Sequence, residues 1–69
     1  MILDRIENAF LLAYALDDQK KVETVRGLRD RFLTDRAAYE GSKITREAFQ
    51  ATEIDVSRAL HALFSTSAR

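Results

Sequence analysis

The stretch EGSKIT at residues 40–45 decides the fold, because residues that end one helix and start another stand together there. Gly41 is placed to take the left-handed conformation that commonly ends a helix. Thr45 is a favourable N-cap for the helix that follows. Ile44 before the cap and Phe49 four residues after it have the spacing of a hydrophobic staple. The stretch therefore predicts a helical hairpin.

The second arm of this hairpin is expected to run from Thr45 to about Ser65. Its apolar residues recur at helical spacing and form one stripe, made of Phe49, Val56, Leu60 and Leu63. Thr52 and Ala59 lie at the edge of the stripe. The periodicity predicts a helix with one buried face.

The first arm is expected to be helical from Ile2 to about Glu40, since the chain has no proline and only two glycines. The polar residues 17–21 interrupt its apolar periodicity. A turn could separate two helices there, with Asp17 or Asp18 as the N-cap. We favour a single continuous or kinked helix, because the interruption contains neither glycine nor proline.

The apolar run from Ala9 to Leu16 gives the middle of the first arm apolar side chains on nearly all sides. A single partner helix cannot cover such a surface. A chain of 69 residues is also short for a stable core, and without cysteine it has no disulfides. We therefore predict an all-α single domain over residues 1–69 that assembles as a homodimer.

Catalytic chemistry is not indicated by the residues present. His61 is the only histidine, no cysteine is available, and no glycine-rich phosphate loop or metal-binding motif occurs. We expect His61 to be an ordinary surface or interface residue. The chain is predicted not to be an enzyme and to hold no cofactor or metal.

The charges are balanced, with 11 basic and 11 acidic residues. A protein that binds nucleic acid usually has a basic excess or a basic face. Arginines crowd the region before Gly41, at positions 26, 29, 31 and 36, but acids follow three of them at a distance of four residues. We therefore expect a mixed solvated face and no direct nucleic-acid contact, and a small DNA-binding regulator remains an alternative.

The longest apolar run has eight residues, from Ala9 to Leu16, and about 20 are needed to cross a bilayer. Asp4 and Glu7 precede this run, where a secretory signal would carry positive charge. We expect a cytoplasmic protein that does not insert into a membrane.

Two arginines, Arg29 and Arg36, interrupt the apolar stripe of the first arm. Either their stems cover the core while the guanidinium groups reach water, or the stripe continues into a binding surface, where arginine and tyrosine are enriched. The aromatic residues of the arm have the same two interpretations. The candidate partner-binding residues are Phe10, Tyr14, Leu28, Arg29, Arg36 and Tyr39.

Residues 41–49 resemble the turn and staple of short bacterial SHOCT-type hairpins. Across the whole chain, the length, the long arm carrying Phe10 and Tyr39, the turn at Gly41 and the lack of cysteine, proline and tryptophan resemble the small quorum-sensing anti-activators of Pseudomonas phages. This resemblance implies a helical homodimer, made in an infected bacterium, that inhibits a LuxR-type transcription regulator by direct binding. A pilus-assembly ATPase is a further implied partner. Secretion-system co-chaperones that form helical hairpins are the structural alternative.

Overall fold

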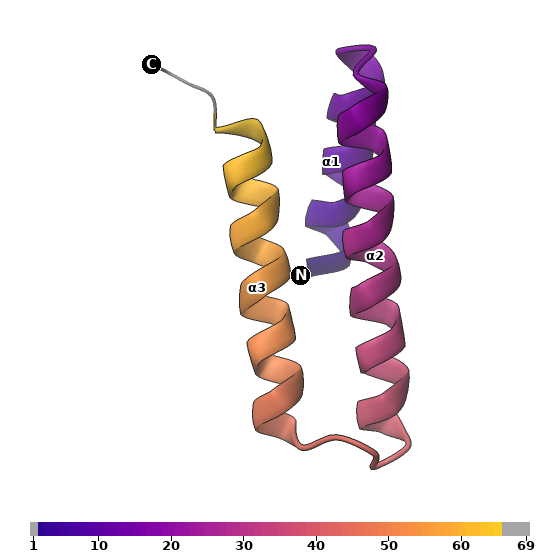
Figure 1. The fold of residues 1–69 in the computed structure, drawn as a ribbon, viewed down its shortest axis with the longest axis vertical. Coiled ribbons are helices and arrows are strands. Elements are labelled where there is room, and N and C mark those ends of the chain that lie inside the picture. The colour runs from indigo at the N-terminus through magenta and orange to yellow at the C-terminus, as the bar shows by residue number, and fades with distance from the viewer. Residues whose placement is uncertain (1, 66–69) are drawn as a thin grey trace.

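The computed structural model describes residues 2–65, which form three α-helices and no strand. Helix α1 spans Ile2–Ala15, α2 spans Gln19–Glu40 and α3 spans Arg46–Phe64. In Figure 1, α2 and α3 run side by side as a long hairpin, and α1 lies against the half of this hairpin that is remote from the α2–α3 loop. The predicted all-helical class is confirmed for the described residues.

The region predicted as one long first arm is two helices, so the continuous helix that we favoured from the sequence is wrong. Helix α1 ends at Ala15, and Asp17 adopts a left-handed φ of 55°. Helix α2 then begins at Gln19 and runs back along α1. Aspartate tolerates the left-handed region better than most residues. The chain therefore reverses here without glycine or proline.

Hydrogen bonds close this reversal on both sides. The backbone N–H of Asp17 donates to the carbonyl of Tyr14 (3.0 Å), and that of Asp18 donates to the carbonyl of Ala13 (3.1 Å). Together they make a Schellman motif. The Asp18 carboxylate then accepts from the backbone N–H of Lys21 at 3.2 Å, so Asp18 caps α2. The alternative prediction of a turn with an aspartate N-cap is therefore the correct one.

The loop between α2 and α3 lies where the sequence predicted it, but its left-handed residue is Ser42. Ser42 has a φ of 62°, whereas Gly41 has a φ of −86°. The N–H of Ser42 donates to the carbonyl of Tyr39 (3.0 Å), and that of Lys43 donates to the carbonyl of Ala38 (2.8 Å). This pair of bonds places the left-handed position one residue after Gly41. The left-handed conformation predicted for Gly41 is wrong by one position.

The start of α3 agrees with the sequence prediction. The Thr45 side chain accepts from the backbone N–H of Ala48 at 3.1 Å, which is the N-cap bond. Ile44 and Phe49, at the two positions of the staple, are both half-buried. Helix α3 therefore begins at Arg46, directly after the predicted cap.

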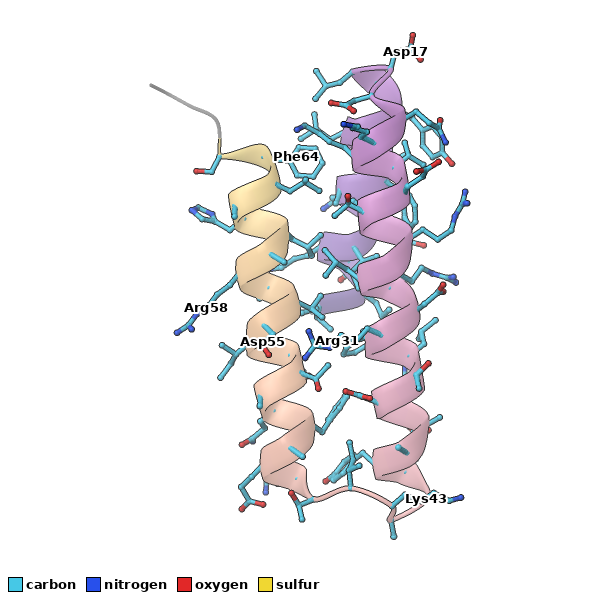
Figure 2. All side chains as sticks on the ribbon, in the orientation of Figure 1. Asp17, Arg31, Lys43, Asp55, Arg58 and Phe64 are labelled. Atoms are coloured by element: carbon cyan, nitrogen blue, oxygen red, sulfur yellow. The ribbon has the colours of Figure 1, made fainter. Side chains whose placement is uncertain are left out.

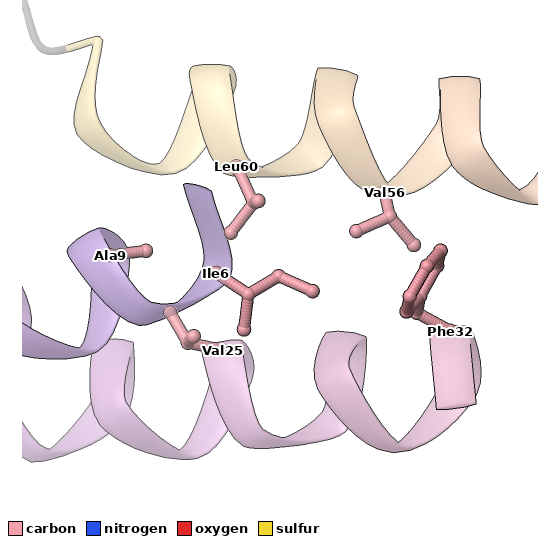
Figure 3. Close-up of a cluster of buried hydrophobic side chains, with 6 residues drawn as sticks. All are labelled: Ile6, Ala9, Val25, Phe32, Val56 and Leu60. Carbon is pink, nitrogen blue, oxygen red and sulfur yellow. The ribbon is translucent and has the colours of Figure 1, made fainter. Parts of the chain in front are cut away.

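The core lies between the three helices. Six of its residues form one cluster, drawn in Figure 3: Ile6, Ala9, Val25, Phe32, Val56 and Leu60. Helix α1 contributes mostly small buried residues, since Ala9 and Ala13 flank the single large side chain of Ile6. Small residues allow helices to approach closely, so α1 packs against the hairpin through Ile6 and the two alanines, while Leu11, Leu12 and Tyr14 stay exposed.

Polar links join the helices around this core. The hydroxyl of buried Thr52 on α3 donates to the carboxylate of Asp35 on α2. Arg31 and Asp55, both labelled in Figure 2, form an ion pair between the same helices at 3.1 Å. Both side chains are about half exposed. An exposed ion pair contributes little, whereas a buried hydroxyl must keep its partner. The Thr52 bond is therefore the more important link for the hairpin.

Candidate functional site

Large apolar side chains remain exposed on α1 and at Leu16, the residue that follows it. The exposed fractions are 68% for Leu11, 45% for Leu12, 59% for Tyr14 and 56% for Leu16. We call these four residues the α1 apolar surface. They occupy several sides of the last turns of α1, as the apolar run in the sequence predicted. Exposed apolar groups gathered in this way mark interaction sites on soluble proteins.

The α1 apolar surface extends toward α3. Leu12 lines a depression of about 280 Å³ between the two helices, together with Leu60, Phe64 and His61. His61 is exposed, as the sequence predicted. The depression opens next to the end of α3 where Phe64 projects toward α2, visible in Figure 2.

A second surface exists because α1 is shorter than its neighbours. Helix α2 has 22 residues and α1 has 14, so at 1.5 Å per residue α2 extends about 12 Å beyond the start of α1. Figure 1 shows the N-terminus of α1 partway along the hairpin, so that among residues 2–65 no third helix lies beside the end near the loop. A groove of about 430 Å³ opens at this position. We call it the end groove.

Three aromatic rings line the end groove. The Phe49 ring lies 5.2 Å from the Tyr39 ring, stacked with an interplanar angle of 8°, and 5.6 Å from the Phe32 ring, tilted by 34°. Phe32 is buried, while Tyr39 is 38% exposed. Ile2 and Leu3, at the start of α1, close one end of the groove. The floor is therefore apolar and belongs to all three helices.

Charged side chains form the rim of the end groove. Arg36 Nε donates to Glu40 Oε2 at 3.4 Å, one turn apart on α2, and both side chains are largely exposed. Glu53 lies across the groove on α3 and is half-buried. Within residues 2–65, no ion pair or hydrogen bond engages the Glu53 carboxylate. The rim therefore carries two carboxylates and one guanidinium, and the guanidinium is already bonded.

The six candidate partner-binding residues fall into separate places. Arg36 and Tyr39 come together in the end groove. Phe10 and Tyr14 stack on α1 with ring centroids 6.3 Å apart, near the other end of the molecule. Because α1 runs back along α2 from the turn at Asp17, about 12–19 residues of α2, or roughly 18–28 Å, separate the two pairs.

The two remaining candidates lie between these pairs on α2. Arg29 is exposed, whereas Leu28 is half-buried and packs against the core cluster. Phe10 also packs against this cluster. The structure therefore supplies two surfaces where the sequence suggested one.

Sequence reasoning did not assign Ile2, Leu3, Phe32, Phe49 and Glu53 to a binding surface. A signal for part of this set was present, because Phe32 and Tyr39 are seven residues apart and share one face of a helix. The staple placed Phe49 on the opposite arm, at the same end of the hairpin. The open groove itself depends on where α1 starts against α2, and that position depends on the break at Asp17.

Other site types find little support among residues 2–65. No group of three or more acidic or histidine side chains is close enough to bind a metal, and no helix has the length and apolarity that a membrane span needs. Arg31 and Arg36 are each bonded to a carboxylate, whereas Arg26 and Arg29 are exposed and form no ion pair within residues 2–65. Comparisons of the chain with protein-family models, curated proteins and solved structures gave no match.

Proposed function

We propose that this chain is a non-enzymatic protein-binding protein that works as a homodimer and inhibits a host protein by direct contact. The observation that carries the proposal is the α1 apolar surface, whose four large side chains are 45–68% exposed. Water contact with so much apolar area is unfavourable, and burial against another protein removes it. A folded chain of this kind is expected to associate.

The dimer is assigned to the α1 apolar surface because of its size and position. A standard interface takes roughly 800 Å² from each partner. The described chain exposes 4945 Å², so such an interface would use about a sixth of it. Helix α1 lies on the outside of the hairpin and presents its leucines on more than one side. Two copies packed through α1 would bury these leucines between the protomers.

The target that we propose is a LuxR-type transcription regulator in the bacterial cytoplasm, with a pilus-assembly ATPase as a second target. Support comes from the resemblance to phage anti-activators and from the exposed residues of the end groove. Tyr39 and Arg36 belong to the residue types most enriched at binding hot spots. Both are accessible, and neither is needed to seal the core cluster.

The experiment has two stages. Light scattering of the purified chain at low micromolar concentration should give the mass of a dimer. Calorimetric titration against a purified LuxR-type regulator should then show binding that Tyr39→Ala or Arg36→Ala weakens by about thirtyfold, which corresponds to a hot spot of about 2 kcal/mol. His61→Ala is the matched control and should bind like the parent.

Each stage can refute one part of the proposal. A stable monomer would remove the homodimer. Normal folding and undiminished binding of both groove variants would remove Arg36 and Tyr39 from the partner surface. Binding to duplex DNA at about 50 mM salt, lost steeply as salt is added, would favour the DNA-binding alternative instead.

A further inference from the structure

We propose that the end groove receives an amphipathic helix of the partner protein, one that carries large apolar side chains on one stripe and a lysine or arginine beside that stripe. This inference rests on the proposed function, since it specifies the kind of partner segment. It is carried by the shape of the groove, its aromatic floor and the charge of its rim.

The shape of the groove suits a helix because the groove continues the position that α1 occupies. Helix α1 already packs between α2 and α3, and it stops at Ile2 partway along the hairpin. The uncovered part of α2 is about 12 Å long, which is the length of roughly eight helical residues or two turns. A partner helix entering there would extend the three-helix packing toward the α2–α3 loop.

The floor of the groove requires apolar anchors. The Phe49 ring contacts both other rings, since Tyr39 stacks at 5.2 Å and Phe32 lies at 5.6 Å. The three rings therefore form one packed cluster, with Phe32 buried beneath the other two. Tyr39 is the member that stays 38% exposed. Leucine or phenylalanine side chains spaced at i, i+4 and i+7 on a partner helix would cover its exposed face.

The rim of the groove selects a basic partner. Arg36 is bonded to Glu40, and Glu53 is half-buried with no cation bonded to it within residues 2–65. A lysine or arginine on the incoming helix would neutralise Glu53 as water leaves the groove. An acidic helix would bring a further carboxylate toward two that are already present, and such like-charge contacts are unfavourable.

The charge of the rim also argues against a second copy of this chain as the occupant. The α1 sequence carries Asp4 and Glu7 against the single basic Arg5. Placing α1 of another copy in the groove would therefore add negative charge beside Glu53. The α1 apolar surface and the end groove are accordingly assigned to different partners.

The test uses two synthetic alanine-based helical peptides of about 14 residues. Both carry leucines at i, i+4 and i+7, and they differ only in having two lysines or two glutamates beside the leucine stripe. Each is titrated into the full isotope-labelled chain while backbone amide shifts are recorded. The lysine peptide should bind about tenfold more tightly than the glutamate peptide, with the largest shift changes at Tyr39, Phe49 and Glu53.

A charge exchange makes the test specific. In Glu53→Lys the preference should reverse, so that the glutamate peptide binds more tightly. Glu23→Lys makes the same charge change on an exposed part of α2 outside the groove, and it should keep the preference of the parent. Glu53→Gln, a smaller change, should reduce the preference without reversing it. Melting temperatures of the three variants should match the parent.

Four results would overturn the inference. The first is that neither peptide binds at about 1 mM, and the second is that the two peptides bind equally. The third is that the shift changes occur on the α1 apolar surface instead of the groove. Shift changes in the groove that depend on protein concentration without peptide would assign it to a second copy and also contradict the inference. The first three results would leave dimerisation unaffected, because it is measured separately by light scattering, whereas the last would move the dimer interface to the groove.

Discussion

Replacing Leu11 and Leu12 together by glutamine should dissociate the proposed homodimer without unfolding the chain. The two side chains are 68% and 45% exposed in the protomer. Together their exposed area is a little more than that of one fully exposed leucine side chain. Full burial of a leucine contributes about 1.5–3 kcal/mol. Because a symmetric dimer contains each residue twice, the double substitution should weaken it by about 3–7 kcal/mol. This corresponds to at least about a hundredfold in the dissociation constant.

Sedimentation equilibrium of the parent and the double variant over a range of concentrations measures this difference directly. Circular dichroism at a concentration where both are monomeric should give similar helix content, because neither leucine belongs to the core cluster. Ile54→Gln on α3 is the matched control. It removes an aliphatic side chain that is 51% exposed but lies outside the α1 apolar surface, and it should leave the dimer intact.

A parent-like dissociation constant for the double variant would refute the assignment of the interface to α1. Loss of the dimer in Ile54→Gln alone would instead move the interface to the α1–α3 side, where Ile54 lines a shallow pocket with Ile2. Both results are separable from unfolding by the circular dichroism measurement.

Four predictions concern the turns and the links between helices. Thr52→Val should lower the free energy of unfolding by about 1–2 kcal/mol in urea denaturation, because it removes the donor of Asp35 and places no polar group in exchange; an unchanged midpoint would show that this bond contributes nothing. Thr45→Ala should cost about 1 kcal/mol by removing the N-cap of α3, measured by the same titration. Gly41→Ala should stabilise the chain by about 0.4–1 kcal/mol, since Gly41 has an ordinary φ of −86° and an added Cβ would make only a van der Waals contact. Ser42→Gly should also stabilise the chain by about 0.5 kcal/mol, because Ser42 adopts the left-handed conformation. If Gly41→Ala were destabilising, the left-handed conformation would belong to Gly41, as the sequence predicted.

The sequence was sufficient to predict helix α3, its N-cap and its buried face. Thr45 caps α3 as predicted, and the buried residues of α3 lie on the predicted stripe or its edge. These features depend on interactions within a few residues, such as the bond from Ala48 N–H to the Thr45 hydroxyl. Local chemistry of this kind is readable from a sequence without knowledge of the tertiary structure.

The sequence was insufficient to predict that the chain reverses at Asp17. Its left-handed conformation costs energy locally, and burial of Ile6, Ala9 and Ala13 against the hairpin offsets that cost. The balance depends on contacts between residues far apart in the chain, so a pattern of apolar residues along one helix does not determine it. The lack of glycine and proline at the break was a misleading indicator for the same reason.

The sequence predicted only part of the candidate site, because the exposure of its residues also depends on contacts between distant parts of the chain. Arg36 and Tyr39 were identified because they depart from the pattern of a sealed core, and the structure places both in the end groove. Phe49 was assigned to the core because the sequence could not show that α1 stops before reaching it. The exposure of a stripe residue depends on the lengths of the neighbouring helices, and these lengths follow from the position of the turn.

One turn therefore produces both candidate surfaces. Because α1 reverses at Asp17, it lies on the hairpin with its small residues inward, and its leucines face solvent. Because α1 has only 14 residues, the same reversal leaves the last two turns of α2 without a third helix. A continuous helix from Ile2 to Glu40 would project α1 beyond the hairpin, so that neither the α1 apolar surface nor the end groove would have its present neighbours. The reversal at Asp17 thus allows a chain of 69 residues to present an exposed apolar surface at one end and a groove with an aromatic floor at the other.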